Sequence, residues 1–291
     1  MSSERIGGVL VNNADKVWWP EDGITKGDVA HFYDEVWPAL GPWLRDRPLV
    51  AERCPDGMLG HCFYQKDFPP GTLPREAPRL TLRAASTGKD VHYLVGGSRQ
   101  TTIAMVGLGC IALHVMNARR AMLRKPDWLA FDLDPSDGGF ADAARAGLLL
   151  GKLLDELGLV SYPKTSGSRG LHVFVPLRPR YTDDQVLAFA SRVGAELAER
   201  APALVTVEHS KARRGRRLFA DAFRNAFAQT IVSPYSVRRR PQAPVSAPLA
   251  WDEVRATLDP ERFNVRTFER LRGAHDPWKD FWRSRQSLPS P

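Results

Sequence analysis

Two aspartates separated by one residue end an apolar segment in the middle of the chain. The segment WLAFDLD covers residues 128–134 and contains Asp132 and Asp134. If it forms a β-strand, both side chains lie on the same face, because successive side chains of a strand alternate between two faces. Neighbouring carboxylates repel each other, and a cation between them relieves that repulsion. Carboxylate oxygens suit Mg²⁺ or Mn²⁺, so the pair is a candidate metal site.

A turn of small residues follows about thirty positions later in the sequence. The motif SGSRG covers residues 166–170 and precedes His172. Its backbone N–H groups, the hydroxyl of Ser166 and the guanidinium of Arg169 could cradle phosphates, and His172 could donate to a phosphate oxygen. Many hairpins contain Ser and Gly, so the turn alone is a weak signal. Beside the carboxylate pair it favours phosphoryl or nucleotidyl transfer with two cations.

The positive charge of the chain is concentrated in one stretch. The whole chain has 41 Lys and Arg against 33 Asp and Glu, a net charge of +8. Residues 211–240 hold nine basic side chains and a single acid, Asp221, and therefore account for the same +8. Such an excess favours polyanionic partners such as nucleic acid or nucleotides, although a solvated basic face is the common alternative. The isolated acid is a further site candidate.

Several classes of protein are disfavoured. No apolar run approaches the ~18 residues that span a bilayer, and the start, MSSERIGG, is too polar for a secretory signal. We therefore expect a cytoplasmic protein without membrane contact. Three cysteines, Cys54, Cys62 and Cys110, are too few for a disulfide framework, and we expect reduced thiols. A zinc site of Cys54, His61 and Cys62 fits no common ligand spacing.

The pattern of apolar residues predicts an α+β fold with two modules, residues 1–125 and 126–291. In the first, Thr25 and Asp28 have capping-box spacing at a helix start, and strands are expected over 49–54 and 101–106. The second has the β-α-β-β-α-β order of ferredoxin-like and RNA-recognition-motif-like folds. Its predicted elements are strand 127–134, helix 140–157, strands 160–165 and 171–177, a helix capped by Thr182 and ending at Arg200, and strand 204–208. Further strands over 218–223 and 230–232 and two C-terminal helices complete it.

This topology makes the first and third strands of the second module neighbours. The carboxylate pair and the SGSRG turn should therefore meet. An EF-hand is excluded, because Asp137 and Ala143 occupy the positions that need Gly and Glu. A haloacid-dehalogenase-like phosphatase, with Asp132 as nucleophile, stays an alternative, although its D-x-D motif normally opens the domain.

One further motif points to a different chemistry. Gly107, Gly109 and Ala112 fit G-x-G-x-x-A, the dinucleotide-binding pattern, if a strand precedes them and a helix follows. A lone match is weak, and the chain lacks the repeated parallel units of that fold.

Taken together, the motifs resemble the primase–polymerase domain of bacterial ligase D. This domain belongs to the archaeo-eukaryotic primase superfamily and acts in non-homologous end joining. The similarity covers about residues 10–255. It rests on NNADKVWWPEDGITK, FYQK, DLDPSD, KTSGSRGLHVFVPL, RRLFADAFRN and PYSVRRRPQAPVSAPLAWDEV.

The resemblance implies a role for each matched residue. The catalytic, metal-binding acids would be Asp132, Asp134 and Asp221. Contacts to the nucleotide would come from His114, Ser166, Arg169, His172, Arg224 and Arg238, with core packing as the alternative for His114. Lys16 and Lys26 would hold the 5′-phosphate of a DNA end, and Phe63, together with Tyr64, would stack on a template base.

The resemblance also implies the activity and the partners. These are template-directed nucleotide addition with two Mn²⁺ or Mg²⁺ ions, a nucleoside triphosphate substrate with ribonucleotides preferred, and gapped or broken DNA in the nucleoid. The end-binding protein Ku and a DNA ligase in trans would be partners, since 291 residues leave no room for a ligase domain. We expect a stand-alone relative or a piece of a longer protein. A non-catalytic nucleic-acid-binding module is the main alternative.

Overall fold

The computed structural model describes residues 2–69, 71, 73, 77–84, 87–267 and 276–289. Its contacts divide the chain into two compact units. The first unit comprises Met1–Ala121, Thr230–Ser246 and Glu261–Ala274, and the second comprises Met122–Gln229, Ala247–Pro260 and His275–Pro291. Segments 230–246 and 261–274 group with the first unit, although the expected division at residue 125 assigns them to the second module.

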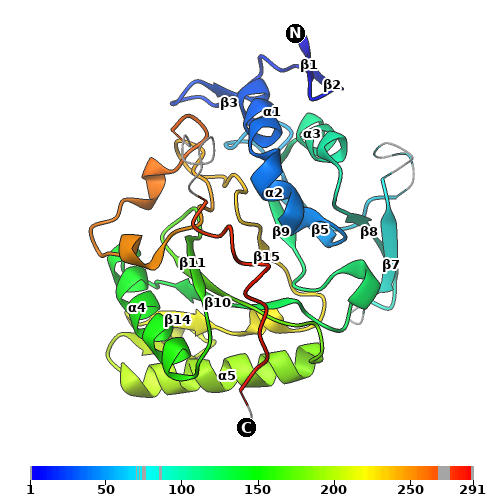
Figure 1. Cartoon of the computed structure of the whole chain (residues 1–291). Helices are drawn as coiled ribbons and strands as arrows, with labels where there is room; N and C mark the ends of the chain where they lie inside the picture. The colour runs from blue at the N-terminus through cyan, green and yellow to red at the C-terminus, as the bar shows by residue number, and fades with distance from the viewer. Residues whose placement is uncertain are drawn as a thin grey trace. The chain divides into compact units, whose positions relative to one another are not determined.

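The second unit contains a five-stranded sheet and two long helices. Across the sheet the strands follow the order β11-β12-β10-β14-β13, and neighbours are antiparallel except β13 and β14, which are parallel. Figure 1 shows α5 lying along this sheet. The elements are β10 (Trp128–Asp134), α4 (Phe140–Glu156), β11 (Tyr162–Thr165), β12 (Leu171–Pro176), α5 (Asp183–Arg200), β13 (Val205–Thr206), α6 (Lys211–Arg214) and β14 (Leu218–Asp221).

Local sequence signals explain where these elements begin and end. The Thr182 side chain accepts from the backbone N–H of Gln185, whose side chain accepts from the Thr182 N–H, so the predicted capping box starts α5. The strands and helices predicted between residues 127 and 223 are confirmed, each to within two residues at either end. The observed fold is α+β, as expected.

The order of the strands departs from a plain ferredoxin-like sheet at one point. The fourth strand of that motif would lie beside the first, but here β14 lies between β13 and β10. Asp221 therefore reaches the centre of the sheet, directly opposite Asp132.

The two faces of β10 have different surroundings. Leu133 points to the helices, since a Cβ at Gly147 of α4 would come within 3.8 Å of its side chain. On the other face, Trp128 stacks on Phe174 with ring centroids 4.5 Å apart, and Trp278 packs 5.4 Å from Phe174. The apolar end of that face is thus covered by the C-terminal segment, and its other end carries polar side chains.

The first unit is built on a second, larger sheet. The order of its strands is β15-β9-β5-β8-β7, with β6 paired to β5. Its main elements are α1 (Lys26–Glu35), α2 (Trp37–Leu44), β5 (Pro48–Arg53), β6 (Phe63–Gln65), β7 (Arg79–Arg83), β8 (Asp90–Val95), α3 (Arg99–Gly107), β9 (Cys110–Val115) and β15 (Ile231–Val232). Two small hairpins precede them, β1 (Ser3–Ile6) with β2 (Val9–Asn12), and β3 (Val17–Trp19) with β4 (Ile24–Thr25).

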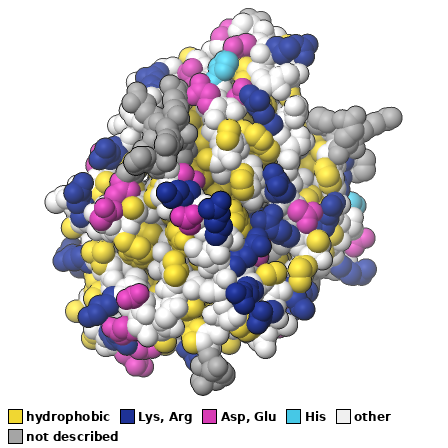
Figure 2. All heavy atoms as spheres, in the orientation of Figure 1, with side chains coloured by type: hydrophobic (Ala, Val, Ile, Leu, Met, Phe, Trp, Pro, Cys, Tyr) yellow, Lys and Arg dark blue, Asp and Glu magenta, His cyan; other side chains and the backbone are white. Residues whose placement is uncertain are grey.

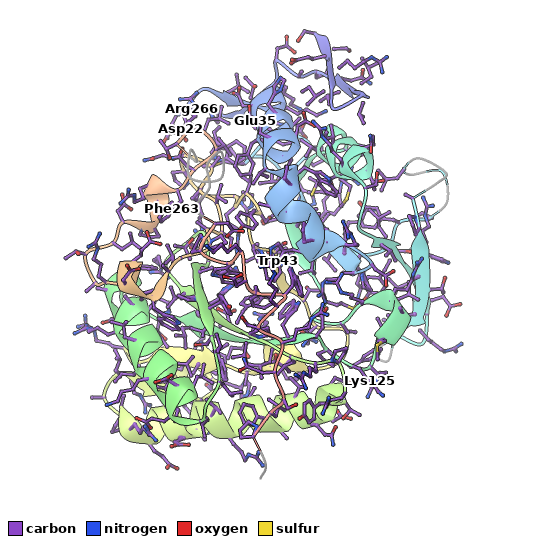
Figure 3. All side chains as sticks on the ribbon, in the orientation of Figure 1. Asp22, Glu35, Trp43, Lys125, Phe263 and Arg266 are labelled. Atoms are coloured by element: carbon purple, nitrogen blue, oxygen red, sulfur yellow. A yellow bond between two sulfur atoms is a disulfide. The ribbon has the colours of Figure 1, made fainter. Side chains whose placement is uncertain are left out.

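Segments distant in sequence complete the first unit. The backbone N–H of Gln242 donates to Asp22 Oδ2 at 2.7 Å, and the N–H of Val245 donates to the carbonyl of Phe263 at 2.7 Å. Asp22, Phe263 and Arg266 are labelled in this region in Figure 3. These contacts tie 240–246 and 261–267 to the β3–β4 hairpin and to each other.

Three expectations from the sequence are wrong. Residues 101–106 are helical, because the Ser98 side chain accepts from the N–H of Thr101 and caps α3. The dinucleotide pattern therefore lies between a helix and a strand, the reverse of the required order. Cys54 and Cys62 form a disulfide, because the β5–β6 connection brings their Cα atoms to 4.4 Å, and buried Cys110 is the free thiol.

The third wrong expectation is that two helices follow near the C-terminus. In the described residues after Ser246, the helical segments are the 3-10 turns η3 (Trp251–Glu253) and η4 (Pro260–Arg262). Residues 268–275 lie outside the described ranges. Within the described residues, no helix has both the length and the apolar character needed to cross a bilayer.

Candidate active site

Four polar side chains form one row across the sheet of the second unit. Lys164 of β11 lies opposite His172 of β12, His172 opposite Asp132 of β10, and Asp132 opposite Asp221 of β14. Residues directly opposite on antiparallel strands point to the same face, with Cβ atoms about 4.5–5.5 Å apart. The structure therefore brings two of the three predicted acids, Asp132 and Asp221, together with His172.

Asp134 joins this row from the end of β10. It lies two residues beyond Asp132 and so projects from the same face. The predicted SGSRG turn is a hairpin in which Ser166 Oγ accepts from the N–H groups of Ser168 and Gly170. A Cβ on Gly170 would lie 2.7 Å from the carbonyl oxygen of Leu133, so this glycine allows the hairpin to approach the end of β10. The two motifs meet, as the topology predicts.

Arg224 lies between two of the acids. It belongs to the 3-10 turn η2 (Phe223–Asn225), and its Nε is 3.4 Å from Asp132 Oδ2 and 3.3 Å from Asp221 Oδ2. Over the described part of the chain, no three His, Cys, Asp or Glu side chains are gathered closely enough to hold a metal ion as they stand. The guanidinium supplies the positive charge between these carboxylates in this arrangement.

The pKa values of the three acids are pushed in opposite directions. Burial alone would raise the pKa of Asp132, but the charges and hydrogen bonding of His172, Arg224 and Lys164 hold it below its usual range. Burial raises the pKa of Asp134 and of Asp221, and the negative charge of Asp132 raises both further. One carboxylate is thus firmly ionised beside two that resist ionisation. This imbalance is what a bound cation would offset.

Asn225 is a positioning residue that the sequence interpretation missed. Its buried side chain accepts from the N–H of Ala130 at 2.9 Å and donates to the carbonyls of Ala130 at 2.7 Å and Ala222 at 2.8 Å. The ladder between β10 and β14 ends at Asp132 and Asp221, so Asn225 supplies the next pair of hydrogen bonds to β10. The asparagine is visible in the motif RRLFADAFRN, but a single asparagine does not by itself indicate a positioning role.

The remaining predicted residues belong to the first unit. Phe63 and Tyr64 are neighbours on β6, with 37% and 61% of their surface exposed. They project from opposite faces, because successive strand residues alternate. Tyr64 packs edge-on against His114 of β9 with ring centroids 5.4 Å apart, whereas Phe63 stacks on His61 at 5.9 Å. Tyr64 and His114 thus lie on the same face of the sheet, and Phe63 lies on the opposite face.

Arg238 is held near β9 by a buried tyrosine. The Oη of Tyr33 donates to the carbonyl of Ile111 at 2.7 Å and accepts from the N–H of Val237 at 3.0 Å. The backbone of Arg238 donates to the carbonyl of Pro244. Because Ile111 lies on the strand that carries His114, Tyr33 fixes the Arg238 segment relative to this histidine.

The two predicted phosphate-binding lysines are adjacent. The N–H of Lys26, the first residue of α1, donates to the carbonyl of Lys16 at 2.9 Å. Lys16 Nζ lies 2.7 Å from Asp56 Oδ1, and Lys26 Nζ donates to the carbonyls of Asn12 and Gly107. Burial and the nearby charge of Lys16 lower the pKa of Lys26. Two positive charges near enough to act on each other favour an anionic ligand.

Comparison with known proteins agrees with this geometry. Residues 25–278 match the family described as LigD, primase-polymerase domain. The chain belongs to this family. It is therefore a nucleotidyltransferase of the LigD primase-polymerase type. This membership, and the antiparallel neighbours of β10, exclude the phosphatase alternative, whose fold has a parallel sheet.

Individual relatives show how far the similarity extends. The multifunctional non-homologous end joining protein LigD of Pseudomonas aeruginosa is 32% identical, over 99% of this chain and 34% of that protein. The bifunctional LigD of Bacillus subtilis is 31% identical, over 94% of this chain and 44% of that protein. The polymerase domain of Mycobacterium tuberculosis ligase D in complex with DNA aligns with a TM-score of 0.87 and 28% identity, covering 96% of this chain and 99% of that one. The chain thus spans one LigD domain, and less than half of these curated relatives.

Proposed function

We propose that this LigD-type domain adds nucleotides to a primer 3′-hydroxyl at short gaps or breaks in DNA, under direction of a template strand. The row of Asp132 and Asp221 with Asp134 beside it is the observation that carries this proposal. The second unit would perform the chemistry, and the first would contact the DNA end and template. Ribonucleotide preference follows from the family resemblance and belongs to the same proposal.

The chemistry of these carboxylates suits divalent cations, which would take the place that Arg224 occupies between Asp132 and Asp221. Three acidic side chains project from one sheet face, and burial together with the negative charge of Asp132 raises the pKa of the other two, Asp134 and Asp221. When bound, two Mn²⁺ or Mg²⁺ ions supply positive charge at the primer hydroxyl and at the triphosphate. Asp132, Asp134 and Asp221 would hold them, and Arg224 would turn from the acids to the triphosphate.

Other residues of the chain would orient the nucleotide. The hairpin of Ser166 and Arg169 presents backbone N–H groups and a guanidinium beside the end of β10, which suits phosphate oxygens. His172, His114 and Arg238 would complete the nucleotide contacts. Such fixed donors stabilise the charge that develops on the phosphates during transfer.

DNA would be bound through charge and stacking. Basic side chains are prominent on the face in Figure 2, in keeping with the net charge of +8. Lys16 and Lys26 would hold a 5′-phosphate, and the exposed aromatic rings of Phe63 and Tyr64 would stack on template bases. The solved relative is a complex with DNA. We place the activity at the nucleoid, in end joining or gap filling, with Ku and a ligase acting in trans.

A primer-extension assay tests this function. The protein is incubated with a labelled gapped duplex, Mn²⁺ and either ribonucleoside or deoxyribonucleoside triphosphates, and DNA binding is followed by fluorescence anisotropy. Extension should occur, with ribonucleotides preferred. Asp132→Ala should abolish extension and leave DNA binding largely intact, because binding rests on the basic surface.

The control variant is Asp155→Ala, which removes an exposed acid from α4 and should extend normally. Extension by Asp132→Ala at the normal rate would remove the catalytic assignment. DNA binding by the unaltered protein without extension by either class of nucleotide would favour the binding-module alternative.

A further inference from the structure

Lys16, one of the two lysines proposed to bind the DNA 5′-phosphate, contacts an acid of its own chain. Its Nζ lies 2.7 Å from Asp56 Oδ1 and donates to the carbonyl of Pro55 at 2.9 Å. A lysine ammonium has three donors and no acceptor, so these contacts use two of the three. A phosphate that receives two hydrogen bonds from Lys16 must therefore displace one of these acceptors.

The loop that carries Asp56 is fixed beside Lys16. Residues 54–62 connect β5 to β6, and the disulfide between Cys54 and Cys62 closes this loop. In its middle, the N–H of Met58 donates to the carbonyl of Trp18 at 2.9 Å, only two residues beyond Lys16. The backbone of Asp56 therefore stays near the lysine, whereas its side chain, 73% exposed, is able to turn away. Asp56 is the acceptor that a phosphate displaces most readily.

Charge explains why a carboxylate lies at this position. The positive charge of Lys16 contributes to the lowered pKa of Lys26, so the two ammonium groups act on each other. The hydrogen bond from Lys16, and then its charge, lower the pKa of Asp56, which is therefore ionised at neutral pH. The carboxylate offsets part of the positive charge of Lys16, and it thereby weakens the attraction of this lysine for any other anion.

We propose that Asp56 is a specificity-determining residue of the DNA-end site, whose carboxylate pairs with Lys16 until a 5′-phosphate displaces it and so limits the preference for phosphorylated ends. The inference rests on the proposed binding of a DNA end by Lys16. A phosphate monoester carries a charge of about −1.5 to −2 at pH 7 and three acceptor oxygens, so it is a stronger ligand for an ammonium than a carboxylate is. A 5′-hydroxyl carries no charge and leaves the ion pair in place.

A supporting role for Asp56 is the competing explanation, in which the carboxylate holds the Lys16 ammonium ready for the phosphate. The two explanations predict opposite changes. Removing a competitor strengthens the binding of a phosphorylated end, whereas removing a support weakens it. Asp56→Asn separates them, because it removes the negative charge and keeps both the shape and an oxygen that accepts hydrogen bonds.

The test is fluorescence anisotropy with two labelled gapped duplexes, which carry either a 5′-phosphate or a 5′-hydroxyl at the downstream end of the gap. The Kd for the hydroxyl end divided by the Kd for the phosphate end measures the preference. Asp56→Asn should raise this ratio about 2–5-fold, the upper part of the range that exposed ion pairs contribute. Asp67→Asn, which removes the same charge from an exposed contact with His92, is the matched control and should leave the ratio unchanged.

A second pair of variants shows whether Asp56 acts through Lys16. Lys16→Ala should lower the ratio, because it removes one of the two positive charges proposed to bind the phosphate. Adding Asp56→Asn to Lys16→Ala should then leave the ratio of the single variant unchanged, since the ion pair no longer exists.

Each result bears on the proposal. An unchanged or lower ratio in Asp56→Asn would overturn it, and so would an equal rise in the Lys16→Ala background. If the unaltered protein binds both duplexes equally, a preference that emerges in Asp56→Asn supports the proposal, and no preference in either protein overturns it. If the ratios behave as expected but the unaltered protein adds no nucleotide, the proposed function fails and the role of Asp56 stands.

Discussion

Replacing Asn225 with alanine tests how the end of the catalytic sheet is held. Beyond Asp221 the chain leaves β14, and the backbone of Ala130 in β10 loses its strand neighbour on that side. The Asn225 side chain replaces that neighbour with one accepted and one donated hydrogen bond, and a third bond anchors it to Ala222. In Asn225→Ala, the buried N–H of Ala130 has lost this acceptor.

The size of the effect follows from these contacts. An unsatisfied buried donor costs about 1–3 kcal/mol, and each ordinary hydrogen bond contributes about 0.5–1.5 kcal/mol. The carbonyls of Ala130 and Ala222 tolerate the loss of a hydrogen bond better than the N–H of Ala130 does. We therefore expect Asn225→Ala to lower the free energy of unfolding by about 2–4 kcal/mol. Primer extension should fall as well, since Arg224 and Asp221 adjoin the loosened turn.

Urea denaturation followed by circular dichroism provides the measurement. The matched control is Asn12→Ala, whose exposed side chain makes one hydrogen bond to Ser3 and should cost no more than about 0.5 kcal/mol. Equal unfolding midpoints for Asn225→Ala and Asn12→Ala would refute the view that Asn225 completes the sheet.

Two further predictions concern the first unit. Because burial and then the charge of Lys16 lower the pKa of Lys26 from 10.5, Lys26 loses its proton at a lower pH than an ordinary lysine. Preference for a 5′-phosphorylated gap over an unphosphorylated one should therefore weaken as the pH rises from about 7.5 to about 9.5, and Lys26→Arg should lose less of it, because a guanidinium stays protonated. The same loss in both proteins would contradict this role. Iodoacetamide should label Cys54 and Cys62 only after reduction, and Cys110, whose pKa burial raises, only after unfolding. Mass spectrometry shows which thiols react, and labelling of Cys54 before reduction would argue against the disulfide.

The errors of the sequence interpretation have a common origin. Thr101, Thr102 and Ile103 are β-branched and indicate a strand, but the Ser98 cap and packing make them helical. Three cysteines are too few for a disulfide framework and indicate free thiols, yet the β5–β6 connection brings two of them together. In each case, composition favoured one outcome and the position in the fold determined another.

The sequence by itself determined the local features of this protein. These features depend on residues only a few positions apart, so they can be predicted directly from the sequence. They are the capping boxes at Thr25 and Thr182, the two carboxylates at the end of β10 and the SGSRG hairpin. Tertiary structure decided which strands became neighbours and in what register. Only the insertion of β14 beside β10 brings Asp221 opposite Asp132, and only the pairing of β10 with β12 brings His172 opposite Asp132. Register depends on burying whole sheet faces over long sequence separations, which no local pattern encodes.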